Sequence, residues 1–271
     1  MLVFPFCKIN LGLWITRKRN DGYHDIETVF YPVKLCDILE IIKSPDNDFI
    51  FTTSGLEIPG DTAANLCVQT YHLLRKDYPI PPVRMHLHKI IPAGSGLGGG
   101  SSDGAFTLKA LNEYFTLNLS PEQLYTYARR LGSDCAFFLQ EKPAYARGKG
   151  DEMKEINIDL SSYSILLIKP HANVKTADAY GMIEPLKRKN SLKDVIFQPV
   201  TNWRESLVND FERPVFERFP EIRKIKVSLY EAGAIYASMT GSGSAVYGLF
   251  SGVTPPEELF KGGPGLKSWV T

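Results

Sequence analysis

The sequence is poor in cysteine and has no recognisable cysteine spacing. Its four cysteines, Cys7, Cys36, Cys67 and Cys135, lie far apart, and no C-x-x-C pair occurs. Disulfide scaffolds and zinc ribbons depend on such spacings, so the cysteine pattern argues against both classes. The first residues lack the pattern of a signal peptide, and we expect a protein of the reducing cytoplasm.

An excess of charge is also missing. Lys and Arg together number 31, Asp and Glu together number 30, and the formal net charge is +1. Without a basic stripe the sequence does not predict nucleic-acid binding. No apolar run approaches the roughly 18 residues of a spanning helix, which predicts a soluble protein without a membrane segment.

The remaining composition is that of a folded α+β protein. The chain has 271 residues, of which 44% are hydrophobic, enough for one large or two modest domains. Strand patterns dominate the first forty residues, whereas helix and strand patterns are mixed beyond them. The pattern resets near residue 150, so we predict two domains, residues 1–150 and 151–271.

Glycine is concentrated in one place. Six of the 22 glycines fall between Gly94 and Gly104, in a segment that follows an alternating strand, residues 83–88. Apolar residues at helical spacing predict a helix over 101–115 after it. A second helix is predicted from the start signal at Ser120 to Gly132, with Pro at its first position and Gln at the capping-box position.

Three known glycine motifs do not explain this segment. A dinucleotide fingerprint would need an acidic residue at the end of a second strand about 20 residues later, where the sequence instead starts a helix. A hydrolase elbow would need an acid and a histidine in order, and His171 is the only later histidine. The Walker pattern G-x-x-x-x-G-K-[ST] is absent.

A phosphate-binding loop is the physical interpretation that remains. Successive glycines allow several backbone N–H groups to converge, and the hydroxyls of Ser101 and Ser102 stand where the following helix begins, at its positive end. A second glycine loop between two predicted strands, Thr240, Gly241, Ser242, Gly243 and Ser244, repeats this chemistry. Alone it would be an ordinary hairpin, but together the loops suggest two walls of a phosphate pocket.

These motifs resemble those of the GHMP kinases. The family's phosphate loop, P-x-G-x-G-L-G-S-S with two additional glycines in some members, is similar to Pro92, Ala93, Gly94, Ser95, Gly96, Leu97, Gly98, Gly99, Gly100, Ser101 and Ser102. The signatures K-I-N-L-x-L and D-G-Y-H-x-I-x-T-x-F, found near the N-terminus in one branch of the family, match residues 8–13 and 21–30. The family's L-G-x-D segment resembles residues 131–134, and Cys7 stands where that branch usually has alanine.

The resemblance implies a two-domain GHMP kinase fold of α+β class with its active site in the cleft between the domains. It further implies transfer of the ATP γ-phosphoryl group, with Mg²⁺, to the 2-hydroxyl of a cytidine diphosphate derivative of methylerythritol, a step of non-mevalonate isoprenoid synthesis. Lys8 and Asp134 map onto the catalytic pair. The positions that map onto substrate contacts are Asn10, Tyr23, His24, Phe30, Thr176 and Tyr180.

Lys8 is unusual by itself, because a lysine in an otherwise apolar strand must find a partner or lose its charge. Asp134 is a carboxylate that the resemblance places near it, and a helix starting at Ser133 would favour its ionised form. Ser101, Ser102 and Asp103 are local candidates for Mg²⁺, but the sequence does not assign the metal ligands.

Two alternatives stay open at this point. Another GHMP kinase with a different small alcohol as substrate would carry the same glycine loops, although the D-G-Y-H signature argues against it. A ligand-binding relative without catalysis is disfavoured because Lys8 and Asp134 are both present.

Overall fold

The computed structural model describes residues 1–252 and 267–270. Contacts divide the chain into two compact units, each built from segments that are distant in sequence. The first unit comprises residues 1–7, 34–93 and 98–141, and the second comprises 8–33, 94–97 and 142–271. The predicted division into residues 1–150 and 151–271 therefore differs from these units. Residues 8–33 and 94–97, which the prediction placed in the N-terminal domain, belong to the second unit.

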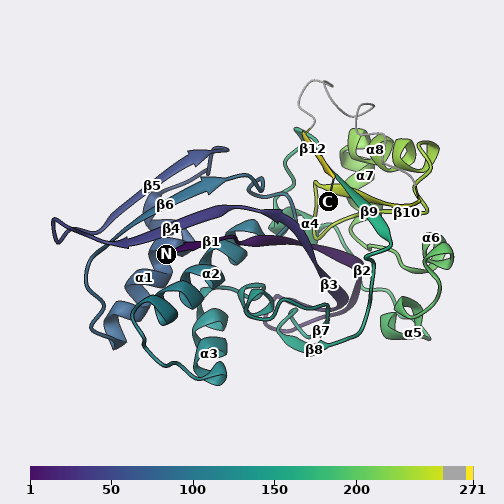
Figure 1. Cartoon of the computed structure of the whole chain (residues 1–271). Coiled ribbons are helices and arrows are strands. Elements are labelled where there is room, and N and C mark those ends of the chain that lie inside the picture. The colour runs from purple at the N-terminus through teal and green to yellow at the C-terminus, as the bar shows by residue number, and fades with distance from the viewer. Residues whose placement is uncertain (253–266, 271) are drawn as a thin grey trace. The chain divides into compact units, whose positions relative to one another are not determined.

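A four-stranded sheet with helices on one face forms the first unit (Figure 1). Strand β6 alternates between buried and half-buried side chains, as expected for a sheet covered on one side. The sheet order is β1-β4-β6-β5, with β5 parallel to β6. Its strands are β1 (Leu2–Val3), β4 (Ile38–Lys43), β5 (Ile50–Gly55) and β6 (Val83–Lys89), and its helices are η1 (Thr62–Ala64), α1 (Leu66–Asp77), α2 (Gly99–Tyr114), α3 (Pro121–Leu131) and η2 (Cys135–Leu139).

The second unit holds two antiparallel sheets. In one, β3 pairs with β7 and β7 with β8, in the order β2-β3-β7-β8; the other has the order β10-β11-β9-β12. Helix α8 packs on β10 and β11 (Figure 1). The strands are β2 (Phe6–Lys18), β3 (His24–Cys36), β7 (Ala144–Arg147), β8 (Glu152–Glu155), β9 (Tyr163–Lys169), β10 (Tyr236–Met239), β11 (Val246–Ser251) and β12 (Lys267–Val270), the first residues of β2 and the last of β3 belonging to the first unit. The helices are α4 (Thr176–Gly181), α5 (Leu192–Ile196), η3 (Val200–Asn202), α6 (Trp203–Ser206), α7 (Glu212–Arg218) and α8 (Pro220–Glu231).

Most predicted elements are present. The start of α3 carries the predicted capping box: the Ser120 hydroxyl accepts from the Gln123 backbone N–H, and the Gln123 side chain accepts from the Ser120 N–H. This reciprocal pairing satisfies amides that lack partners inside the helix. The predicted α+β class is confirmed, and among the described residues no helix is long and apolar enough to cross a membrane.

Two predictions about helix starts were wrong. Helix α2 begins at Gly99, with the left-handed Gly98 as its N-cap, so Ser101 and Ser102 are its third and fourth residues rather than its start. The helix predicted from Ser133 is instead the five-residue 3-10 segment η2, whose first turn forms no side-chain cap with Asp134. A segment that short has a small dipole, so the dipole argument for Asp134 carries little weight.

A buried ion cluster ties α2 to the sheet of the first unit. The Lys89 ammonium at the end of β6 donates to Asp37 Oδ2 at 2.5 Å and to Asp103 Oδ2 at 2.6 Å. Asp37 Oδ1 also accepts the backbone N–H groups of Ile90 and Ile91, whereas Asp103 Oδ1 has no hydrogen-bond partner. One ammonium cannot fully neutralise two buried carboxylates, so we expect the less well-bonded Asp103 to favour its protonated form.

This cluster predicts that stability falls as the pH rises. Burial raises the pKa of Asp103 to about 8, with Asp37 acting in the same direction and Lys89 opposing it. Because the folded state then binds a proton that the unfolded state releases near pH 4, the free energy of unfolding decreases between these values, by up to about 1.4 kcal/mol per pH unit. Asp103→Asn removes this proton.

Urea unfolding at pH 5.5 and pH 8.5 measures the effect. We expect the wild-type protein to lose more stability between the two pH values than Asp103→Asn does. Asp159→Asn, a change at an exposed carboxylate, should keep the wild-type slope. Equal slopes for wild type and Asp103→Asn would show that Asp103 is ionised in the folded protein.

Candidate functional site

A buried lysine lies at the centre of the candidate site in the second unit. Lys8, on β2, is 3% exposed, and its Nζ donates to Asn10 Oδ1 at 2.7 Å and to the Gly96 carbonyl oxygen at 2.9 Å. The Lys8 backbone N–H donates to the carbonyl of Leu97 at 2.9 Å. A buried ammonium is stable only with such acceptors, so the strand and the first glycine loop, residues 92–102, are joined through this side chain.

Asn10 is also held by several hydrogen bonds. Its backbone N–H donates to Thr240 Oγ1 at 3.0 Å, and its Nδ2 donates to Thr28 Oγ1 at 2.9 Å. The Thr28 hydroxyl in turn donates to the Gly12 carbonyl. These bonds fix the Asn10 amide so that its Oδ1 faces the Lys8 ammonium.

The two predicted glycine loops touch each other at Gly96 and Thr240. The Thr240 hydroxyl lies 3.2 Å from both the Gly96 carbonyl oxygen and Asn10 Oδ1, and can donate to either. Gly96 has φ +83°, and a Cβ there would lie 2.1 Å from the Thr240 carbonyl oxygen. Glycine is therefore required at this position for the close approach of the two backbones.

The later part of the first glycine loop belongs to the first unit. Its earliest helical hydrogen bond runs from the Ser102 N–H to the Gly98 carbonyl, so the amides of Gly99, Gly100 and Ser101 precede the helical ladder. The Ser102 hydroxyl is buried and has no hydrogen-bond partner. A first helical turn with free amides and an orphaned hydroxyl has the chemistry of an anion site.

His24 and Tyr180 form an aromatic pair in the second unit. Their ring centroids are 5.1 Å apart with an interplanar angle of 27°. His24 is only 6% exposed, yet neither of its ring nitrogens has a hydrogen-bond partner. Burial, followed by the nearby Lys18 charge, lowers the pKa of His24, so the ring is neutral at pH 7. Two orphaned nitrogens on a buried ring indicate a place for a ligand with a polar edge.

The other predicted substrate residues differ in exposure. Phe30 is buried, with Lys8 Nζ 5.2 Å from its ring centroid, whereas Tyr23 is 61% exposed and faces Lys149. Thr176 begins α4, and its hydroxyl is 3.0 Å from that of Ser242 in the second glycine loop. Asp134 is half-buried in the first unit, directly before η2.

Sequence reasoning missed several of the buried polar residues around these loops. Lys89 occupies the same face of its strand as Val83, Met85 and Leu87. A lysine in register with buried apolar residues was therefore the available signal, and it is the signal that singled out Lys8. In the parts of the chain that the structure describes, no group of three or more His, Cys, Asp or Glu side chains has the arrangement of a metal site.

Family models match both parts of the chain. A model described as the GHMP kinases N terminal domain matches residues 65–142, and a model described as GHMP kinases C terminal matches residues 200–260. These ranges include the first glycine loop and the second one, respectively.

Curated proteins and solved structures are similar over nearly the whole chain. A protein of Bacteroides thetaiotaomicron named 4-diphosphocytidyl-2-C-methyl-D-erythritol kinase is 53% identical over 252 residues, which cover 92% of each chain. A protein of the same name from Bacteroides fragilis strain YCH46 is 49% identical over 263 residues, which cover 96% of this chain and 95% of the relative. A crystal structure titled 4-(cytidine 5'-diphospho)-2C-methyl-D-erythritol kinase is 28% identical with a TM-score of 0.85, covering 100% of this chain and 98% of the other. The predicted resemblance is confirmed, and the chain belongs to the GHMP kinase family.

Proposed function

We propose that this chain is an ATP-dependent kinase that phosphorylates the 2-hydroxyl of 4-diphosphocytidyl-2-C-methyl-D-erythritol, for the non-mevalonate route to isoprenoids. The observation that carries the proposal is the buried Lys8 ammonium, bonded to Asn10 and to the glycine loop. Relatives of this name at 49% and 53% identity support the substrate. All four cysteines are free thiols, in keeping with a cytoplasmic enzyme.

Each chemical task of phosphoryl transfer has a residue in this proposal. Phosphoryl transfer depends mainly on positioning and on stabilising charge. The amides of the first glycine loop and of the first turn of α2 bind the ATP phosphates, and Lys8 stabilises the negative charge of the transferring group. Asp134 accepts the proton of the attacking hydroxyl late in the reaction.

We propose that Mg²⁺ binds at the start of α2, where Ser101, Ser102 and Asp103 are the candidate oxygen donors. When bound, it would neutralise charge on the phosphates. Among the three candidates, Asp103 is paired with Lys89, and the Ser101 hydroxyl shares a hydrogen bond with the Cys135 thiol. Ser102, buried with an orphaned hydroxyl, is therefore the residue we propose to face the ion, which keeps several waters as Mg²⁺ usually does.

The cytidine group is proposed to bind at His24, Tyr180 and Phe30. A cytosine base has a flat face for stacking and a polar edge for hydrogen bonds. The orphaned nitrogens of the neutral His24 ring supply the partners for that edge. Recognition of this kind distinguishes the proposed substrate from the small alcohols used by other family members.

Incubation with ATP, Mg²⁺ and 4-diphosphocytidyl-2-C-methyl-D-erythritol tests the activity. We expect mass spectrometry to detect the substrate with one added phosphoryl group, together with ADP. Homoserine and mevalonate serve as competing alcohols and should give no product. A folded protein that makes no product from the cytidine substrate would contradict the proposal, and binding without turnover would favour the non-catalytic alternative.

Replacing Asp134 tests the catalytic pair. Asp134→Asn keeps the shape of the side chain but removes the proton acceptor, so we expect turnover to fall by about 10²–10⁴-fold. ATP affinity, measured by calorimetry, should stay within a few-fold. Glu141→Gln, which neutralises an exposed carboxylate of the same unit, should leave turnover unchanged. Near-normal turnover of Asp134→Asn would remove Asp134 from the mechanism.

Replacing His24 tests the cytidine site. His24→Phe keeps a ring to stack on Tyr180 but has no nitrogen for the base edge. An unpaired buried polar edge costs about 1–3 kcal/mol, so we expect the KM for the cytidine substrate to rise about 5- to 150-fold, with the KM for ATP unchanged. His171→Phe, at an exposed histidine, is the control. An equal rise of both KM values in His24→Phe would argue against a base contact.

A further inference from the structure

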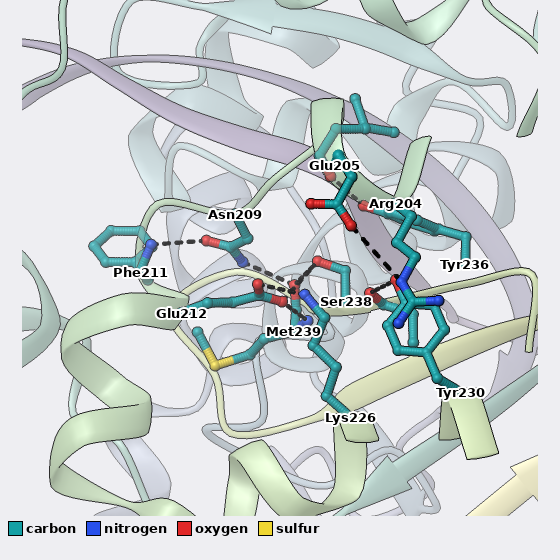
Figure 2. Close-up of polar contacts among 12 residues, drawn as sticks. Arg204, Glu205, Asn209, Phe211, Glu212, Lys226, Tyr230, Tyr236, Ser238 and Met239 are labelled. Carbon is teal, nitrogen blue, oxygen red and sulfur yellow. Dashed lines mark hydrogen bonds and ion pairs between the residues drawn. The ribbon is translucent and has the colours of Figure 1, made fainter. Parts of the chain in front are cut away.

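The turn from Asn209 to Glu212, at the start of α7, contacts the second glycine loop in the second unit (Figure 2). Asn209 is 2% exposed and Glu212 is 8% exposed. Neither residue is part of the catalytic or substrate-binding set described above. Buried polar side chains are retained at an energetic cost, so their partners indicate what they do.

Asn209 uses its whole amide group. Its Nδ2 donates to the carbonyl oxygens of Met239 at 2.7 Å and Gly241 at 2.9 Å, and its Oδ1 accepts from the Phe211 N–H at 3.0 Å. Both hydrogens of the amide are used, so its orientation is fixed. The two carbonyls flank Thr240, and the backbone of Thr240 is therefore held on both sides.

Glu212 holds the strand that leads into the same loop. Its Oε1 accepts from the Met239 N–H at 2.8 Å and from the Ser238 hydroxyl at 3.1 Å, while Oε2 accepts from Lys226 Nζ at 2.6 Å (Figure 2). The Lys226 ammonium balances the charge of the buried carboxylate. Strand β10 thus ends at a position set by α7 and α8.

The same turn, together with Val208 directly before it, is bound to β2, the strand that carries Lys8 and Asn10. The Leu13 N–H donates to the Val208 carbonyl at 3.0 Å, and the Asp210 N–H donates to the Leu13 carbonyl at 2.8 Å. Asp210 Oδ2 accepts the Ile15 N–H at 2.8 Å. Because one short turn bonds to both β2 and the second glycine loop, it fixes the distance between them.

Thr240 links the position of the second glycine loop to the groups that surround Lys8. Its hydroxyl accepts from the Asn10 N–H and lies 3.2 Å from Asn10 Oδ1 and from the Gly96 carbonyl oxygen. Those are the two oxygens that accept hydrogen bonds from Lys8. A shift of Thr240 therefore moves both acceptors of the ammonium, and displacements near 1 Å are enough to slow a reaction about 100-fold.

We propose that Asn209 is a positioning residue for phosphoryl transfer. It holds the Met239 and Gly241 carbonyls so that Thr240 keeps Asn10 and Gly96 in place for the Lys8 ammonium. The inference rests on the proposed function, because its kinetic consequence is a change in the kcat of that reaction.

Asn209→Asp is the most direct test. The substitution keeps the shape of the side chain and the oxygen that accepts from Phe211, but it places an oxygen against two carbonyl oxygens. We expect kcat to fall about 10- to 100-fold, while the KM values for ATP and for the cytidine substrate stay within about threefold. Where circular dichroism shows that Asn209→Asp is unfolded, Asn209→Ala, which only removes the donors, is measured against the same expectation.

Val215→Ala is the matched control for stability. Val215 lies on α7, the helix that follows Asn209, is fully buried in the apolar core, and is not among the partners of the loop. Its truncation should lower the urea midpoint without changing kcat, since cavity formation acts on stability. If both variants lower kcat in proportion to their loss of stability, Asn209 has only a structural role.

A second arm tests the route through Thr240. In a Thr240→Val background the hydroxyl is absent, so adding Asn209→Asp should cost less than about threefold in kcat. Full additivity of the two effects would overturn the inference. In ¹³C NMR spectra the Thr240 methyl signal should shift in Asn209→Asp and stay in place in Val215→Ala, and an unchanged signal in Asn209→Asp would also overturn it.

These results separate the two proposals. Absence of turnover in the folded wild-type protein contradicts the proposed function, and the NMR arm still tests whether Asn209 sets the position of Thr240. Wild-type turnover together with normal kcat in Asn209→Asp contradicts only the positioning role.

Discussion

The candidate site in the second unit depends on the burial of one positive charge. The Lys8 ammonium has left bulk water, and such a group is tolerated only where oxygen acceptors replace its hydration. Asn10, two residues along the same strand, and Gly96, far away in sequence, provide these acceptors. The arrangement of the first glycine loop on β2 follows from this requirement, as does the close contact between that loop and Thr240.

Two further buried charge clusters among the described residues hold a segment to a sheet. Lys89 with Asp37 and Asp103 connects the start of α2 to the sheet of the first unit, and Glu212 with Lys226 fixes the end of β10 in the second. Glycine loops have high conformational freedom and cannot hold themselves in one shape. Strong, directional contacts from neighbouring elements compensate for that freedom, which is why polar groups are retained in positions where apolar ones would pack more easily.

Local features were predictable because their causes are local. The capping box of α3, the helix that follows the glycine segment and the strand–turn–strand around the second glycine loop each depend on neighbouring residues, and all are present. Two elements were missed: β5 lies at the edge of its sheet with mostly exposed side chains and so has no apolar alternation, and α5 has too few residues for a helical period. The start of α2 was misplaced by two residues, because a left-handed Gly98 can cap a helix without any side-chain signal. Glycine positions in the loop were clear from the sequence, but the contact that makes Gly96 obligatory was not.

The sequence by itself determined the family and the two glycine loops, since these are encoded in contiguous motifs. The resemblance that these motifs carry then supplied the candidate catalytic and substrate residues. Only the tertiary structure decided which side chains contact one another. It shows that Thr240 bonds to Asn10 and that His24 stacks on Tyr180 with its nitrogens unsatisfied. It also shows that Asn209 holds the loop around Thr240. The physical reason is that hydrogen bonds and ring contacts act over a few ångströms. The partners concerned are separated by up to 230 residues in the chain, and no local pattern records which of them folding will bring together.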